Sequence, residues 1–127
     1  MTTQQTFILV VDDNVELAEN IAEVLALEGF RATLAASAEE ALPRALEADV
    51  SFVITDFRLP GIDGAELVTR VRKARPDDEV TFIVISGHTD DQTQRCAEQA
   101  GATFLPKPVN FAELTGLVRE GYASPLL

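Results

Sequence analysis

The sequence predicts an α/β fold in which a five-stranded parallel sheet is doubly wound, with five helices on its two faces. Short apolar runs recur five times along the 127 residues, and helix-like segments lie between them. The strongest runs show little alternation of polar and apolar residues, which is typical of strands covered on both faces. Strand and helix therefore alternate as they do around a parallel sheet. Because 127 residues is a usual length for one domain, we expect a single domain over residues 1–127, with its core at about 7–122.

The five predicted strands differ in strength. Three are short, β-branched runs that should lie inside the sheet, at Phe7–Val11, Ser51–Thr55 and Thr81–Ser86. The runs at Arg31–Ala35 and Thr103–Pro106 are weaker and more polar, as strands at the edges of a sheet tend to be. The sequence thus indicates both the number of strands and which of them are exposed.

The helices are predicted from apolar faces and capping residues. In the first helix Leu17, Ile21, Val24 and Leu25 share one face, and Gly29 should stop it. Each later helix begins where an N-cap residue stands three positions before Glu or Gln. These pairs are Ser37 with Glu40, Asp63 with Glu66, Thr89 with Gln92, and Asn110 with Glu113.

Some positions in the helices carry expectations of their own. Pro43 falls inside the second helix and should kink it, and Gly101 and Gly121 are expected to be C-caps. Residues 87–101 contain no Leu, Ile, Val, Phe or Met. The fourth helix should therefore be the least firmly docked, burying only the small residues Cys96, Ala97 and Ala100.

Composition excludes several classes of function. The formal net charge is −11, from 10 basic and 21 acidic residues, and such a surface should repel nucleic acid. No apolar run approaches the roughly 20 residues of a membrane span, so no contact with a membrane is expected. The single cysteine, Cys96, cannot form an internal disulfide, which favours a reducing, cytoplasmic location.

Charged and polar residues close the predicted strands. Asp12 and Asp13 follow the first strand, Asp56 the third and Lys107 the fifth, while Ser86 ends the fourth. The carboxyl ends of parallel strands meet at one edge, where ligands bind. Asp and Ser commonly follow strands as N-caps, but that explanation does not account for a paired Asp, a third Asp and a Lys at one edge.

Three close carboxylates raise one another's pKa unless a positive charge lies among them. A hard divalent cation with oxygen ligands provides that charge, and Mg²⁺ is the usual choice. The sequence has no Cys/His cluster for zinc or copper. A metal, a lysine and a hydroxyl around one spare carboxylate suggest phosphoryl chemistry, with Asp56 as the nucleophile.

The chain resembles the receiver domains of two-component response regulators from about Phe7 to Tyr122. The resemblance rests on "VVDDN" (10–14), "ITDFRLPGIDG" (54–64), "VISGH" (84–88) and "FLPKP" (104–108). It implies the flavodoxin-like strand order 2-1-3-4-5. It also implies a signalling phosphoacceptor, rather than an enzyme in the usual sense, that catalyses its own phosphorylation and dephosphorylation.

The resemblance assigns a role to each site residue. Asp56 would be the phosphoacceptor, and Mg²⁺ would be held by Asp12, Asp13, Asp56 and the backbone carbonyl of Arg58. We expect Asp13 to be the principal ligand, with Asp12 acting mainly through a bound water. The remaining roles are Lys107 as the phosphate-pairing lysine, Ser86 as the switch hydroxyl and Phe104 as the switch aromatic.

This chain departs from the family pattern at a few positions. Ser stands at 86 where Thr is commoner, and Phe at 104 lacks the hydroxyl of Tyr. Arg58, Gly87 and His88 flank the site, and two of these positions, 58 and 88, tune phosphate lifetime in relatives. We also expect a cis bond between Lys107 and Pro108, because the chain must turn sharply there while the ammonium points back toward Asp56; the resemblance implies the same isomer.

The resemblance also implies partners. A sensor histidine kinase or a histidine phosphotransfer protein would supply the phosphoryl group. The surface around the fourth helix, fifth strand and fifth helix would then switch its affinity for a downstream protein or output domain, or for a second copy in a phosphorylation-dependent dimer.

Three other functions fit these residues less well. A phosphatase of the haloacid dehalogenase type requires an acidic residue two positions after its nucleophile, where this chain has Arg58. A flavodoxin-like cofactor binder needs a hydroxyl- and glycine-rich phosphate loop after the first strand, where this chain has acids. An interaction module that works without phosphorylation often loses an acidic or lysine position, and all of these are present.

Overall fold

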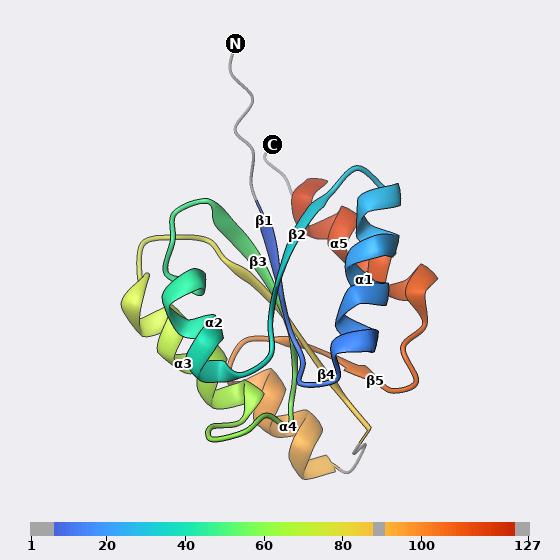
Figure 1. Cartoon of the computed structure of the whole chain (residues 1–127). Coiled ribbons are helices and arrows are strands. Elements are labelled where there is room, and N and C mark those ends of the chain that lie inside the picture. The colour runs from blue at the N-terminus through green and yellow to red at the C-terminus, as the bar shows by residue number, and fades with distance from the viewer. Residues whose placement is uncertain (1–6, 88–90, 124–127) are drawn as a thin grey trace.

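The computed structural model describes residues 7–87 and 91–123, and within them strands and helices alternate (Figure 1). The strands are β1 (Phe7–Val11), β2 (Arg31–Ala35), β3 (Val50–Asp56), β4 (Thr81–Ser86) and β5 (Thr103–Pro106). The helices are α1 (Val15–Leu27), α2 (Ala38–Ala45), α3 (Gly64–Ala74), α4 (Asp91–Gln99) and α5 (Phe111–Ala123). Among the described residues, no helix has the length and apolar character needed to cross a membrane.

The five strands form one parallel sheet in the order β2-β1-β3-β4-β5. Helices α1 and α5 cover one face of this sheet, and α2, α3 and α4 cover the other (Figure 1). The predicted fold class and strand order are confirmed. The order reverses between β1 and β3, and this is the point at which such sheets place their ligands.

The interior strands lack alternation because both of their faces are buried. In β1, Ile8 and Val10 belong to the core under α1 and α5, whereas Leu9 and Val11 belong to the core under α2, α3 and α4. Each of the four is at most 1% exposed. The edge strand β2 is different, since Leu34 is 41% exposed.

Three of the predicted helix caps are present. The backbone N–H groups of Glu40, Glu66 and Glu113 donate to the side chains of the N-caps that were predicted for them, Ser37, Asp63 and Asn110. The fourth N-cap, Thr89, lies outside the described residues. Gly29 and Gly101 follow α1 and α4 with φ of 91° and 93°, a left-handed conformation that glycine adopts without strain.

The C-cap predicted at Gly121 is wrong, because α5 continues to Ala123. A Cβ atom on Gly121 would lie 2.5 Å from Cε2 of Phe52 in the sheet. This glycine is therefore explained by close packing and not by the end of a helix. Pro43 does lie inside α2, which ends two residues later at Ala45.

The prediction for α4 is partly wrong. Cys96 is exposed, Ala100 is half-buried, and the buried residues of the helix are Thr93 and Ala97. Hydrogen bonds from α3 add to this small apolar contact. The Arg72 guanidinium donates to the carbonyls of Ala100 and Gly101, over 3.1 and 2.8 Å.

Candidate functional site

The predicted site residues meet at the carboxyl edge of the sheet. Asp12 and Asp13 follow β1, and Asp56 is the last residue of β3. Each of the three offers a carboxylate oxygen, and within the described part of the chain these oxygens lie within 4.8 Å of one another. The Lys107 ammonium, just beyond β5, lies 3.5 Å from Oδ2 of Asp56 and 3.7 Å from Oδ2 of Asp12.

The three carboxylates differ in their surroundings. Asp12 is 3% exposed and Asp56 is 8% exposed, whereas Asp13 is exposed. Burial raises the pKa of Asp12 above its ordinary value, and the nearby Asp13 charge raises it further, although the Asn14 N–H and Lys107 oppose the shift. Burial likewise raises the pKa of Asp56, the Asp12 charge adds to this, and Lys107 opposes it.

This donor set fits a hard divalent cation. The cluster holds three carboxylates, and the Lys107 ammonium pairs with two of them, Asp12 and Asp56, so this lysine leaves negative charge uncompensated. Oxygen ligands of this kind are the ones that Mg²⁺ and Ca²⁺ prefer. The Arg58 backbone slightly opposes the rise in the pKa of Asp56, which places the loop after β3 beside the cluster.

The start of α1 fixes Asp12. The Asn14 N–H donates to Oδ1 of Asp12 over 2.9 Å, and the Asn14 side chain accepts from the Leu17 N–H as the N-cap of the helix. The second oxygen of Asp12 is the one that faces Lys107. Sequence reasoning did not identify Asn14 as a support for the site, although an Asn directly before an apolar helical pattern is an N-cap signal.

The other predicted residues lie around this cluster. Ser86 is buried at the end of β4, and its carbonyl accepts from the Lys107 N–H over 2.8 Å. The Lys107–Pro108 peptide bond is cis, the isomer expected from the sequence. Phe104 is half-buried against the core under α2, α3 and α4. Arg58 and Gly87 are exposed, and His88 lies outside the described residues.

Two residues that the sequence reasoning missed hold the backbone of Asp56. The Thr55 hydroxyl donates to the Asp56 carbonyl over 2.9 Å. Gly64 at the start of α3 approaches so closely that a Cβ atom there would lie 2.5 Å from the same carbonyl oxygen. A glycine directly after the N-cap Asp63 was the visible signal for this close approach.

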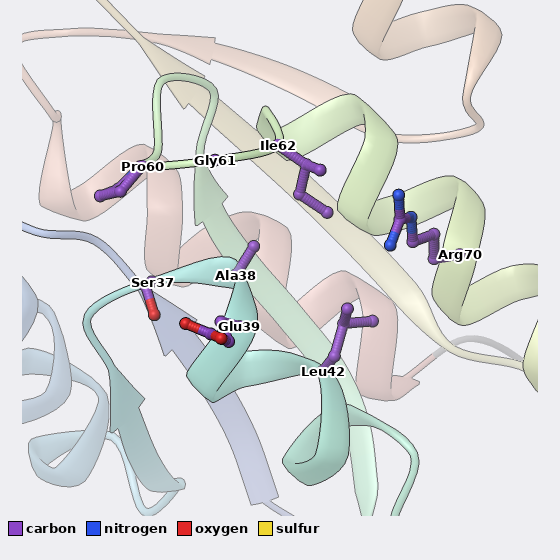
Figure 2. Close-up of a pocket in the computed structure, with 8 residues that line it drawn as sticks. All are labelled: Ser37, Ala38, Glu39, Leu42, Pro60, Gly61, Ile62 and Arg70. Carbon is purple, nitrogen blue, oxygen red and sulfur yellow. The ribbon is translucent and has the colours of Figure 1, made fainter.

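A separate hollow of about 430 Å³ lies between α2 and α3 (Figure 2). Leu42 of α2 and Ile62 of the loop before α3 line it, with Arg70 of α3 at its side (Figure 2). Arg70 is already paired with Glu66 at 3.0 Å, and the acidic cluster does not reach the hollow. The chemistry of this chain is therefore concentrated at the carboxyl edge of the sheet.

Comparisons with known proteins find a family whose model spans most of this chain. The model of the response regulator receiver domain family matches residues 8–119, from β1 into α5. A response regulator receiver protein of Anaeromyxobacter sp. is 38% identical over 102 residues, which are 80% of this chain and 42% of that protein. A two-component response regulator of Oryza sativa subsp. japonica is 32% identical over 114 residues, covering 87% of this chain and 67% of that one.

A solved structure has the same fold. The receiver domain protein (CheY-like) from Methanospirillum hungatei is 28% identical, superposes with a TM-score of 0.83, and covers 91% of this chain and 92% of its own. The similarity thus includes the sheet and both layers of helices. This chain spans less than half the length of the Anaeromyxobacter protein.

Proposed function

The chain belongs to the response regulator receiver domain family, and from that premise we propose that Asp56 accepts a phosphoryl group from a sensor histidine kinase or a histidine phosphotransfer protein. Receiver domains act in two-component signalling, and the acidic pocket of Asp12, Asp13 and Asp56 fits a phosphoacceptor site. The single observation that supports Asp56 is its position, at the end of β3, 3.5 Å from Lys107 and within the acidic cluster.

In this proposal one carboxylate oxygen of Asp56 forms the new O–P bond while the P–N bond of the donor phosphohistidine breaks. Lys107 pairs with a phosphoryl oxygen, since its ammonium already faces Asp56, and the Ser86 hydroxyl donates to another. Hydrolysis by water later breaks the O–P bond, releases inorganic phosphate and returns the free carboxylate. In this role the chain would be a signalling phosphoacceptor that promotes its own phosphorylation and dephosphorylation.

Mg²⁺ is the proposed cofactor. Asp13 would be its principal ligand, with Asp56 and the Arg58 carbonyl, while Asp12 would act mainly through a bound water. The ion would neutralise the negative charge that spreads over the phosphoryl oxygens. The exposure of Asp13 beside the two buried carboxylates supports its role, because an incoming ion meets it first.

The proposed output is a change in the surface formed by α4, β5 and α5. Phosphate would draw Ser86 toward Asp56, and the half-buried Phe104 would move into the vacated space. This surface would then bind a downstream protein, an output domain or a second copy. We propose that residues 1–127 act in this way as one receiver domain in the cytoplasm.

Incubation with acetyl phosphate and Mg²⁺, followed by intact-mass analysis, tests the assignment. We expect one added phosphoryl group in the wild type and none in Asp56→Asn or after chelation of the metal. Asp63→Asn is the matched control, because Asn also caps a helix and Asp63 lies at the start of α3. Label that persists in Asp56→Asn would overturn the assignment.

A further inference from the structure

The backbone that follows the Asp56 side chain makes hydrogen bonds to β3, β4 and α3. The Phe57 N–H donates to the Ile85 carbonyl of β4 over 2.8 Å, and the Phe57 carbonyl accepts from the Gly64 N–H over 2.7 Å. The pairing of β1 with β3 ends at Thr55, so Asp56 lies just beyond that ladder. At this point the donor to the Asp56 carbonyl is the Thr55 hydroxyl, at 2.9 Å.

Packing alone does not explain a threonine at position 55. Thr55 is 0% exposed, and the residues before it in β3, Phe52, Val53 and Ile54, are all apolar and buried. Valine has nearly the same shape and carries no polar group into the core, where an unpaired hydroxyl is costly. The hydroxyl is therefore retained at a position where its hydrogen bond goes to the backbone of the neighbouring carboxylate residue.

Gly64 at the start of α3 also approaches this carbonyl closely. A Cβ atom on Gly64 would lie 2.5 Å from the Asp56 oxygen and 3.1 Å from the Phe57 Cα, so the start of α3 stands directly against this peptide. The Asp56 carbonyl cannot rotate toward α3 because Gly64 is too close. Rotation away from α3 would break its hydrogen bond with the Thr55 hydroxyl. Both polar groups of this peptide, the Asp56 carbonyl and the Phe57 N–H, thus have hydrogen-bond partners.

We propose that Thr55 is a positioning residue for phosphoryl transfer, whose buried hydroxyl orients the Asp56 backbone and so holds the carboxylate opposite Lys107. This inference rests on the proposed role of Asp56. The carboxylate lies 3.5 Å from the Lys107 ammonium, and a rotation of the backbone at Asp56 would carry this carboxylate away from the ammonium.

The effect should appear in the maximal rate. Misplacement of a reacting group by about 1 Å can slow a reaction by about 100-fold. Loss of one of several fixed points should displace Asp56 less than this, so we expect Thr55→Val to lower the maximal phosphorylation rate by roughly tenfold. The concentration of acetyl phosphate at half-maximal rate should change little, because Thr55 is buried and does not touch the donor.

The test compares four proteins at saturating Mg²⁺, with acetyl phosphate varied and product measured by intact mass. Thr55→Val removes the hydroxyl, and Thr55→Ser keeps it and should restore the wild-type rate. Thr115→Val is the matched control, since Thr115 is 4% exposed and its hydroxyl donates to the Ala112 carbonyl within α5, over 3.1 Å. Thermal unfolding of each variant reports the loss of stability separately from the rate.

The expected pattern is a slow Thr55→Val and normal rates for both other variants, with similar losses of Tm in the two valine variants. A Thr55→Val rate within about twofold of wild type, or an equal slowing in Thr115→Val, would show a merely structural role and overturn the inference. Thr55→Ala gives the same comparison should the valine variant not fold. A wild-type chain that takes up no phosphoryl group would instead overturn the assignment of Asp56, and this inference with it.

Discussion

Gly64→Ala should destabilise the protein, although alanine is the better helix former. Gly64 is the first residue of α3, and at an ordinary helix position alanine is favoured by about 1 kcal/mol. Here the added Cβ would lie 2.5 Å from a backbone oxygen and 3.1 Å from a backbone carbon, and backbone atoms give way less easily than side-chain ends. Overpacking of this kind costs about 1–3 kcal/mol, so after the helix preference is subtracted we expect a net loss of up to roughly 2 kcal/mol.

Gly116→Ala provides the matched control, with the opposite sign. Gly116 lies within α5, and a Cβ atom there would meet nothing within 4 Å. Alanine should therefore stabilise the protein by about 0.5–1 kcal/mol through its helix propensity. Relative to the wild type, Gly64→Ala should lower the free energy of unfolding and Gly116→Ala should raise it. The difference between the two variants should be roughly 2 kcal/mol.

Urea unfolding followed by circular dichroism, without metal, measures this gap. For a domain of this size, a gap of about 2 kcal/mol corresponds to a Tm difference of roughly 6–10 °C. Gly64→Ala should also slow phosphorylation, because the displaced backbone belongs to Asp56. A Gly64→Ala variant as stable as Gly116→Ala would refute the claim that α3 stands directly against this peptide.

Three further predictions concern the charged site and the fourth helix. Burial raises the folded-state pKa of both Asp12 and Asp56 above the ordinary 3.8. In this pH range the metal-free folded state therefore binds more protons than the unfolded state. The free energy of unfolding should then rise as the pH falls from neutrality through the raised pKa values toward 3.8. Asp12→Asn should be more stable than the wild type at neutral pH and show less of this rise in urea titrations, and a pH-independent difference would contradict the reasoning. Mg²⁺ should raise the Tm, by the equivalent of about 2.7 kcal/mol at 100 times its Kd, and Asp13→Asn should weaken its binding, so that equal affinities in calorimetry would exclude Asp13 as the principal ligand. Amide hydrogen exchange should be fastest among the helices in α4, which buries only Thr93 and Ala97, and should change on phosphorylation; protection above that of α1 would show that α4 is firmly docked.

The strands were predictable because their signal is local. A run such as β4, Thr81–Ser86, has buried neighbours on both faces, so its continuous apolar character appears directly in the sequence. Gly121 shows where local reading fails. Its contact is with Phe52, about seventy residues earlier in the chain, and glycine at the end of a helical pattern has the same appearance whether it caps the helix or admits a ring. Cys96 was misplaced for a similar reason, since the face that α4 presents to the sheet is decided by packing with its neighbours.

The site was predictable to the level of which residues meet. Parallel strands bring their carboxyl ends together whatever lies between them, so Asp12, Asp56 and Lys107 could be grouped before their distances were known. The unequal burial of Asp12 and Asp13 could not be read from two adjacent acids. Nor could the contacts of Thr55 and Gly64, which depend on how closely α3 approaches the end of β3.

The burial of β1 on both faces has a consequence for how the chain finds its register. In most sheets a slip by one residue exposes the apolar side of a strand, and this penalty selects the correct pairing. In β1 a slip would only exchange Ile8 and Val10 with Leu9 and Val11 between two apolar layers. The discriminating residues are those at the strand's end, since a slip inward would carry Asp12 between the layers as an uncompensated charge, at a cost of several kcal/mol. The acidic pair thus marks where the strand must stop, and the two residues proposed to serve phosphoryl chemistry also help to set the register of β1.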